Sequence, residues 1–309
     1  MSLEHKLRDP WLLAVWPGMG GVAIGAAYYL MAKLGMRLLV EFPAGEIFDL
    51  ENVNVKDGLI VTRRLPRSRM FVSLENANAP REIILFIGDA QPPSRGTAFC
   101  RKLIDHAREL GVEKVFTFAA MATQMRPEHH SQVFGAAIDL ETLAVFEQLG
   151  VHIFENGKIS GLNGVLLGVA AESGMTGGCL LGEIPNVFSQ IPFPKASLAV
   201  LEFFTRMTGI EIDFTELRTH AKTVDATLEI FLKRMEQSAE EAEAEESHQM
   251  QMERASPRAA HSDKKHLEEL FEAARKDHSL AYGLKQELDR LGLFNEYEDR
   301  FLDLFKEPE

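Results

Sequence analysis

An apolar strand followed by a glycine-rich turn opens the chain and constrains its fold more than any other segment. Residues 11–29 read WLLAVWPGMGGVAIGAAYY. Gly18, Gly20 and Ala23 match the G-x-G-x-x-G/A spacing of a dinucleotide-binding turn. Glu41 follows about where a ribose-binding acid would be expected. The segment therefore predicts a strand, a tight turn and a helix, which is the first unit of an α/β fold.

The sequence alone leaves three interpretations of the glycine turn open. Backbone amides at the start of the helix can hold a pyrophosphate, or they can bind a different anion or small ligand. Small residues can also serve only to bring a strand and a helix close together. Pro17 before the first glycine is atypical of the dinucleotide motif. Glu41 belongs as naturally to the segment leading into a hairpin, which argues against an NAD-dependent oxidoreductase.

Composition narrows the class of protein. A chain of 309 residues with 46% hydrophobic residues can bury the core of one or two domains. Its net charge of −13 argues against nucleic acid or an anionic membrane as a partner, because phosphate binding needs clustered Lys and Arg. Cys100 and Cys179 are isolated thiols, which fits a reducing cytoplasm. Pro17 and several glycines interrupt the apolar run 11–36, so we expect no membrane segment or signal peptide there.

Strands and helices alternate through the first 235 residues. The expected strands are 11–16, 37–42, 81–87, 112–120, 151–154 and 179–184. The expected helices are 20–34, 97–110, 140–149, 165–171 and 194–207. Asp57-Gly58 predicts a hairpin between 52–55 and 59–64. This alternation predicts an α/β layered domain with a largely parallel sheet.

The C-terminal part is expected to be helical. Asp213 and Glu216 have capping-box spacing, and an apolar seam follows from Leu217 to Met235 in alternating steps of four and three. Residues 236–254 then hold seven Glu against one Arg, which is typical of a solvated helix or a flexible linker. The predicted organisation has three parts. They are a core domain at 1–235, an acidic linker at 236–262 and a small helical segment at 263–309.

Polar residues near strand ends are the candidate ligand contacts. Asp89 and Gln91 follow a buried strand, where open α/β sheets bind ligands, although Asp89 could equally cap a turn. Asn163 is either a turn residue or a ligand contact, and Glu183 is a candidate buried acid at a strand end. The candidate binding set is Gly18, Gly20, Gly21, Asp89, Gln91, Asn163 and Glu183.

No catalytic motif accompanies these residues. Neither a G-x-S-x-G nucleophile turn, nor a phosphate-binding G-x-x-x-x-G-K-[ST] loop, nor a zinc-binding H-E-x-x-H helix occurs. Adjacent His129 and His130 rarely share one metal, so a surface loop is expected there. The sequence thus predicts no catalytic residue, no metal site and no cofactor.

Taken together, segments spread over roughly residues 10–235 resemble the proteasome assembly chaperone 2 family. They are WPGMG (16–20), AAYYL (26–30), EIFD (46–49), GDAQP (88–92), GKISGLNG (157–164), LLGEIP (180–185), 194–201, Ile212-Asp213 and Leu217. The resemblance implies a three-layer α/β/α sandwich similar to purine nucleoside phosphorylase, here with a C-terminal helical appendage. It also implies a cytoplasmic homo-oligomer, a trimer being one arrangement.

The resemblance further implies an interaction role rather than catalysis. Eukaryotic relatives assist assembly of proteasome α-rings, and some archaeal relatives bind proteasomes through a C-terminal hydrophobic-Tyr-X tail. This chain ends LFKEPE, without Tyr at the penultimate position, so it departs from that tail. We therefore expect a non-catalytic assembly-chaperone-like protein with itself and other proteins as partners. The alternative is a nucleoside- or phosphate-binding protein, or an enzyme, using the crevice at the glycine turn.

Overall fold

The computed structural model describes residues 7–48, 53–61, 64–73, 80–254, 257–277 and 280–305. The chain divides into two units, Met1–Leu232 and Lys233–Glu309. The three-part division predicted from composition stays a prediction.

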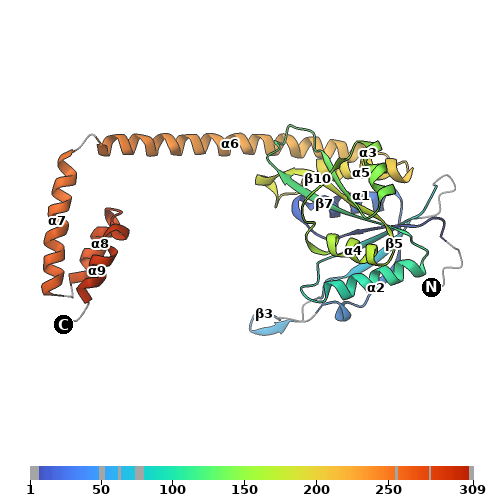
Figure 1. The fold of residues 1–309 in the computed structure, drawn as a ribbon, viewed down its shortest axis with the longest axis horizontal. Helices are drawn as coiled ribbons and strands as arrows, with labels where there is room; N and C mark the ends of the chain where they lie inside the picture. The colour runs from blue at the N-terminus through green and yellow to red at the C-terminus, as the bar shows by residue number, and fades with distance from the viewer. Residues whose placement is uncertain are drawn as a thin grey trace. The chain divides into compact units, whose positions relative to one another are not determined.

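A mixed eight-stranded sheet forms the centre of the first unit (Figure 1). Its strand order is β2–β5–β6–β1–β7–β10–β8–β9. The strands are β1 (Trp11–Val15), β2 (Arg37–Phe42), β5 (Ser68–Val72), β6 (Ile83–Gly88), β7 (Lys114–Thr123), β8 (Val133–Ala137), β9 (His152–Ile153) and β10 (Thr176–Pro185). The central strands β6, β1, β7 and β10 are parallel neighbours, whereas β2, β5 and β8 pair antiparallel toward the edges.

The central strands are apolar because both faces of the sheet are covered. Every residue of β1 and β6 is buried. Side chains alternate between faces, so Leu13 joins one apolar cluster and Leu12 the other. The two clusters make two hydrophobic layers, one on each side of the sheet.

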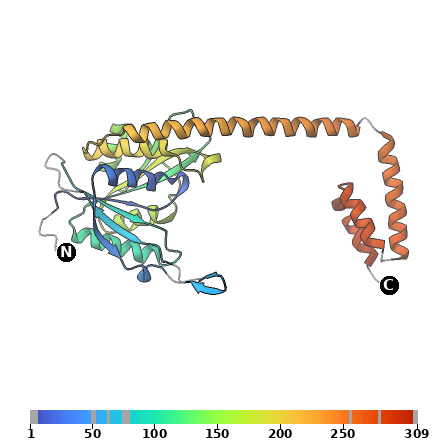
Figure 2. The same ribbon diagram turned by 180° about the vertical axis from the view of Figure 1, so that it is seen from behind.

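Helices cover both faces, as Figures 1 and 2 show. One layer contains η1 (Met19–Gly21), α1 (Val22–Lys33), α3 (Leu140–Leu149), η3 (Asn186–Phe188), α5 (Pro194–Thr208) and the start of α6 (Thr215–Arg254). The other contains η2 (Ala44–Glu46), α2 (Gly96–Glu109) and α4 (Gly161–Glu172). The predicted three-layer α/β/α architecture is confirmed.

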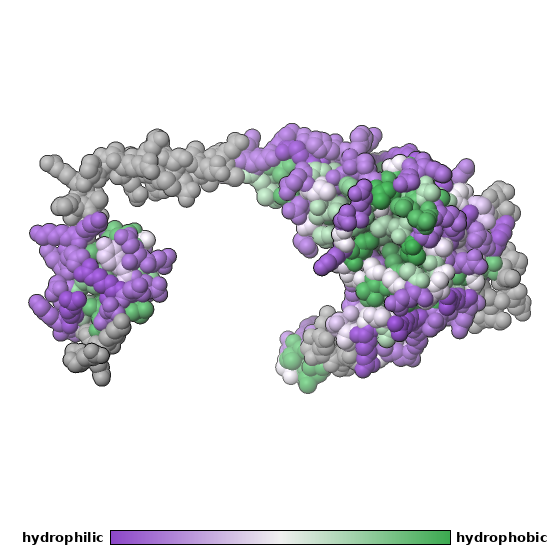
Figure 3. All heavy atoms as spheres, viewed as in Figure 1, coloured by the Kyte–Doolittle hydropathy of each residue, from purple (hydrophilic) through white to green (hydrophobic). Residues whose placement is uncertain are grey.

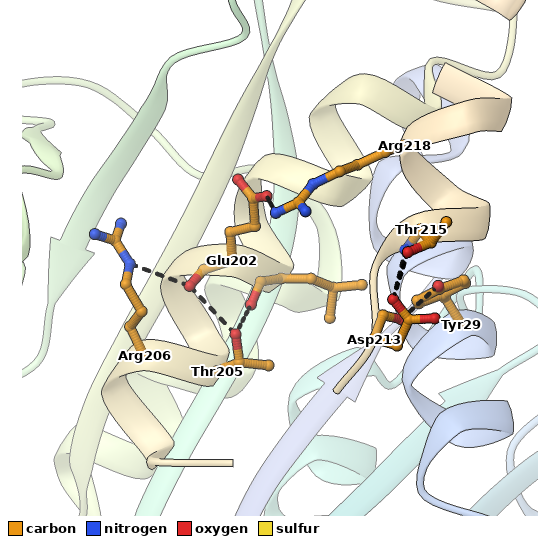
Figure 4. A network of polar contacts seen from close by, with 8 residues as sticks. Tyr29, Glu202, Thr205, Arg206, Asp213, Thr215 and Arg218 are labelled. Atoms are coloured by element: carbon orange, nitrogen blue, oxygen red, sulfur yellow. Dashed lines mark hydrogen bonds and ion pairs between the residues drawn. The ribbon is translucent and has the colours of Figure 1, made fainter. Parts of the chain in front are cut away.

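A polar network fixes the start of α6 (Figure 4). The Asp213 carboxylate accepts hydrogen bonds from the Thr215 amide (3.0 Å) and hydroxyl (2.7 Å), and these bonds lower its pKa. Tyr29 donates its hydroxyl to the Asp213 carbonyl oxygen at 2.7 Å. Asp213 therefore caps α6, while the expected capping-box partner, Glu216, pairs instead with Lys33 of α1 at 2.6 Å.

Strands β5 and β8 are two elements that the sequence did not predict. In β5 the burial alternates, with Ser68 buried and Arg69 paired to Asp89, so its apolar pattern is weak. In β8 the middle residue is Gly135, beside which Phe146 and Val151 leave no space for a Cβ. The expected hairpin is present as β3 (Asn54–Lys56) and β4 (Leu59–Val61).

The second unit is helical. Its helices are α7 (Pro257–Lys276), α8 (Ala281–Arg290), α9 (Phe294–Leu302) and η5 (Asp303–Phe305). Leu267 and Phe271 of α7 share a small apolar cluster with Leu284 and Leu288 of α8. The acidic residues 236–254, for which the sequence allows a helix or a linker, continue α6 as helix.

Candidate functional site

A cavity of about 390 Å³ lies at the carboxyl ends of β1 and β6. Trp16, Gly18 and Met19 line it from the β1–α1 turn, and Gln91 lines it from the β6–α2 loop. β7 and β10 extend past the end of β1 and form its floor with small or apolar side chains. Residues 158–161 and Asn163, around the start of α4, complete the wall.

The topology places the cavity at a switch point of the sheet. β1 and β6 are adjacent and parallel, but β1 leads into α1 on one face and β6 into α2 on the other. The two loops diverge and leave a crevice between them, which is the usual ligand position in open α/β sheets.

Gln91 joins the two sides of this crevice. Its Oε1 accepts a hydrogen bond from the Leu162 amide at 3.0 Å, and its Nε2 donates to the Pro17 carbonyl at 3.5 Å. Gly161 has a φ of +71°, and a Cβ there would lie 2.5 Å from Gln91 Oε1. The left-handed φ therefore favours glycine at 161, and a side chain there would also displace the Gln91 amide.

Two buried polar groups in the cavity wall have no hydrogen-bond partner among the described residues. Asn163 is 7% exposed and its Oδ1 is unpaired. Trp16 is fully buried and its Nε1 is unpaired. Lys158, which also lines the cavity, is exposed. Both unpaired atoms are inaccessible to solvent, so neither is presented to the cavity, whereas Lys158 is.

Of the seven predicted contact residues, the cavity brings together Gly18, Gln91 and Asn163. Gly20 and Gly21 lie beside it in left-handed conformations, with φ of +61° and +57°. Their amides donate to the carbonyls of Ser189 (2.7 Å) and Gly18 (3.1 Å). These two hydrogen bonds help to hold the turn between β1 and α1 in place.

The other two predicted residues lie outside the cavity lining. Asp89 pairs with Arg69 at 2.9 Å and accepts from the Arg67 amide at 3.0 Å. Glu183 accepts from the Thr123 hydroxyl at 2.7 Å and from the Gln132 amide at 3.2 Å. Both carboxylates hold neighbouring segments in place.

The strand order argues against dinucleotide binding through Glu41. In a dinucleotide-binding fold the second strand lies beside the first, which brings its acid to the ribose. Here β2 is the edge strand, with β5 and β6 between it and β1. Glu41 pairs instead toward Arg67, at 4.0 Å.

Trp16 and Lys158 are cavity residues that the candidate set did not include. Trp16 lies in WPGMG and Lys158 in GKISGLNG, two of the segments on which the family resemblance rests. The resemblance could therefore have indicated both residues as candidates. What the sequence could not supply is the position of α4 beside the β1–α1 turn.

The positions of Cys100, Cys179 and His129 indicate no chemical role for their side chains. Cys100 and Cys179 are buried, and burial raises the pKa of each to about 12. His129 lies in a loop, where its Nδ1 accepts a weak hydrogen bond from the Arg126 amide at 3.4 Å. Within the described ranges, no three His, Cys, Asp or Glu side chains cluster as metal ligands would.

The sequence model of the PAC2 family matches residues 12–232. The chain belongs to the PAC2 family. The match ends at the last residue of the first unit and includes the cavity and all of the sheet except Trp11. None of the helices in the described part of this PAC2 protein combines the length and apolarity needed to cross a membrane.

Individual proteins are similar to this chain in sequence or in fold. An uncharacterized protein of Methanocaldococcus jannaschii, MJ1210, is 25% identical over 243 residues, which are 78% of this chain and 90% of the relative. Pyrococcus furiosus PbaB, an archaeal proteasome activator, has a similar fold, with a TM-score of 0.62 and 24% identity over 75% of this chain and 96% of its own. Pyrococcus furiosus PbaA, an archaeal homolog of proteasome-assembly chaperone, gives a TM-score of 0.56 and 24% identity, covering 80% of this chain and 96% of its own.

Proposed function

We propose that this PAC2 protein is a non-catalytic, assembly-chaperone-like protein that self-associates and binds protein partners in the cytoplasm. Its family supports this role, as do structural neighbours described as a proteasome activator and a proteasome-assembly chaperone homolog. The proposal includes a homo-oligomer, with a trimer as one arrangement, and excludes nucleic acid and membranes as partners.

The observation that carries the proposal is an exposed apolar face on the β3–β4 hairpin. Val55 and Ile60 are cross-strand partners, so their side chains share one face, and they are 68% and 72% exposed. Figure 3 shows apolar residues gathered at this hairpin. Contiguous exposed apolar residues on a soluble domain mark interaction surfaces, because their burial against a partner is favourable.

A second apolar surface continues along α6. The seam residues Leu217, Ala221 and Leu228 are buried against the first unit. The next two seam residues, Phe231 and Met235, are about half exposed. These half-exposed apolar side chains add to the surface that we propose for contact with another chain.

The hairpin can be tested with a shape-conserving double substitution. Val55→Thr/Ile60→Thr keeps β-branched side chains, and thus the hairpin, while removing most of its apolar face. We expect the unchanged protein to sediment as an oligomer and the variant to shift toward smaller species. Leu140→Lys is the matched control, because Leu140 is an isolated exposed leucine at the start of α3. Sedimentation equilibrium over a range of concentrations gives the mass.

Partner binding needs a second measurement. The tagged protein is purified from its own cell lysate, and retained proteins are identified by mass spectrometry. Enrichment of assembly intermediates of one complex, reduced by the hairpin substitution, is the expected result. A monomer at all concentrations that retains no protein above the tag control would overturn the proposal.

A further inference from the structure

We propose that the tip of the β3–β4 hairpin of one copy of this protein inserts into an apolar groove beside β8 of a second copy. This contact rests on the self-association proposed above and specifies the two surfaces that meet. It is supported by the exposure of the hairpin, by the lining and position of the groove, and by the charges on both.

The hairpin is apolar on both of its faces. Val55 and Ile60 are cross-strand partners on one face, whereas Leu59 and Val61 lie on the other. Every residue from 54 to 61 is exposed. A two-stranded hairpin is only marginally stable by itself in water, so burial of both faces against a partner would stabilise it. A concave surface can cover both faces of the hairpin, which a flat surface cannot.

A groove of about 480 Å³ offers such a concave surface. The end of β8, residues 154–159 and helix α4 line it, mostly with alanine, glycine and larger apolar side chains. Among the described lining residues, Glu155 alone is charged. A volume of this order holds a small ligand, so the tip of the hairpin, with Leu59 and Ile60, is the part that enters.

Hairpin and groove lie at opposite edges of the sheet. The hairpin follows β2, the strand at one edge, whereas the groove lies beside β8 and β9 at the other. Seven strand spacings of about 4.8 Å place these edges about 34 Å apart. Phe48 and Leu65, on either side of the hairpin in the chain, pack in the apolar cluster below α2. Phe42 of β2 contacts Phe99 of α2, and α2 packs on α4, so both helices lie between the two edges. The hairpin therefore meets the groove of a second copy and not its own.

The charges of the two surfaces are complementary. Lys56 and Asp57 lie at the tip of the hairpin, and the groove contributes Glu155. Lys158 is exposed within the segment 154–159 that lines the groove. None of these four side chains has an ion pair within the described part of the chain. Each charge at the tip thus has a counterpart of opposite sign at the groove, which favours this docking over one between two hairpins.

The contact is head to tail, because the surface that each copy donates differs from the surface that it accepts with. Such a contact adds copies one after another until a ring closes. It also has a consequence that a contact between two identical surfaces lacks. A copy with a defective hairpin can still accept a hairpin, and a copy with a defective groove can still donate one.

Mixing two variants of the full chain tests this consequence. Leu59→Thr/Ile60→Thr removes the apolar tip but keeps strand-forming side chains, and Ala171→Arg places a long charged side chain in the groove from an exposed position of α4. At a concentration where the unchanged protein sediments as an oligomer, we expect each variant alone to be a monomer. An equimolar mixture should form a 1:1 complex and nothing larger, because one intact hairpin and one intact groove remain. Val165→Arg is the control, since Val165 is an exposed residue of α4 outside the groove lining, and this variant should remain an oligomer.

Charge reversal provides the second measurement. Lys56→Glu and Glu155→Lys should each weaken self-association at least tenfold, because each places like charges together, and the chain with both changes should return to within threefold of the unchanged protein. Circular dichroism establishes that every variant is folded before it is mixed.

The outcomes separate this contact from self-association in general. An oligomer that survives Ala171→Arg, or a mixture of folded variants that stays monomeric, overturns the docking of hairpin in groove but leaves self-association standing. Equal weakening in the single and double charge reversals overturns the pairing of Lys56 with Glu155. An unchanged protein that is a monomer at every concentration overturns both this contact and the proposed self-association.

Discussion

Lys195 of α5 and Asp225 of α6 form an ion pair of 2.8 Å whose side chains are only 18% and 17% exposed. The Lys195 ammonium also donates to the carbonyls of His129, at 2.8 Å, and Pro127. One cation therefore holds together α5, the first part of α6 and the loop around residue 129.

Removing the cation from this pair is expected to be costly. Lys195→Met leaves the Asp225 carboxylate largely buried without its partner, so we expect a loss of about 2–4 kcal/mol in the free energy of unfolding. Lys195→Met/Asp225→Leu should recover much of that loss, because no unpaired charge remains. Urea unfolding of the two single variants, the double variant and the unchanged protein measures the coupling. Additive losses would contradict a direct interaction.

The same pair gives a pH dependence. Burial raises the pKa of Asp225, and the hydrogen bond and charge of Lys195 oppose that rise. A raised folded-state pKa favours the protonated form, so its contribution to stability is lost as the pH rises through that value. Without Lys195 the opposing effect disappears. The loss caused by Lys195→Met should therefore be larger at pH 7 than at pH 4.

Asp139 is expected to make the fold acid-sensitive. It caps α3 by accepting from the Thr142 amide at 2.8 Å, and it also accepts from the Gly177 amide of β10 at 3.0 Å. Burial raises its pKa, but these hydrogen bonds outweigh burial and leave the pKa below 3.8. Its contribution to stability is present above the unfolded value of 3.8 and is lost as the pH falls through the folded value.

Two substitutions separate the cap from the charge of Asp139. Asp139→Ala should cost about 1–2 kcal/mol at pH 7, because a helix cap and an acceptor for Gly177 are lost. Asp139→Asn keeps an acceptor and should cost less, while reducing the fall in stability between pH 5 and pH 2. Urea midpoints across this range provide the measurement. An unchanged acid profile in Asp139→Asn would assign the sensitivity to another group.

The two thiols are expected to be inert in the folded protein. Cys100 and Cys179 are fully buried, and burial raises the pKa of each to about 12, which leaves almost no thiolate at pH 8. Ellman's reagent should therefore react with neither in the native state and with both in 6 M guanidinium. Rapid native reaction of either thiol would show that its surroundings open more easily than the packing indicates.

The sequence predicted a helix accurately where particular residues mark its first and last positions. Helix α3 has the predicted bounds because Asp139 caps its start and Gly150, with a φ of +79°, ends it. Strand β5 escaped prediction because polar Ser68 occupies a buried position and apolar Phe71 a partly buried one, so its buried positions Ser68, Met70 and Val72 do not stand out as an apolar alternation. Its strand character depends on neighbours in the sheet, which a single sequence does not reveal.

The candidate site was predictable only in part, for a topological reason. Gln91, which follows a strand end, and Asn163, which the structure places in α4, both line the cavity, and their role as ligand contacts stays a prediction. The contact that builds the crevice joins Gln91 to Leu162, 71 residues apart. No local pattern encodes such a contact. Asp89 and Glu183 have equally suggestive positions, but ion pairing and hydrogen bonding to nearby segments occupy them.

Gly88 at the end of β6 is a sterically restricted position beside the cavity. A Cβ there would lie 2.5 Å from Cδ1 and Nε1 of the fully buried Trp16 indole. Gly88→Ala must therefore displace the indole, and we expect a loss of about 1–3 kcal/mol from overpacking. Gly168→Ala is the control, because nothing lies within 4 Å of a Cβ at that exposed helical position and alanine favours helix by about 0.5–1 kcal/mol. Thermal midpoints should thus move in opposite directions. Equal midpoints for the two variants would show that the indole shifts without cost and that Gly88 does not fix the wall of the cavity.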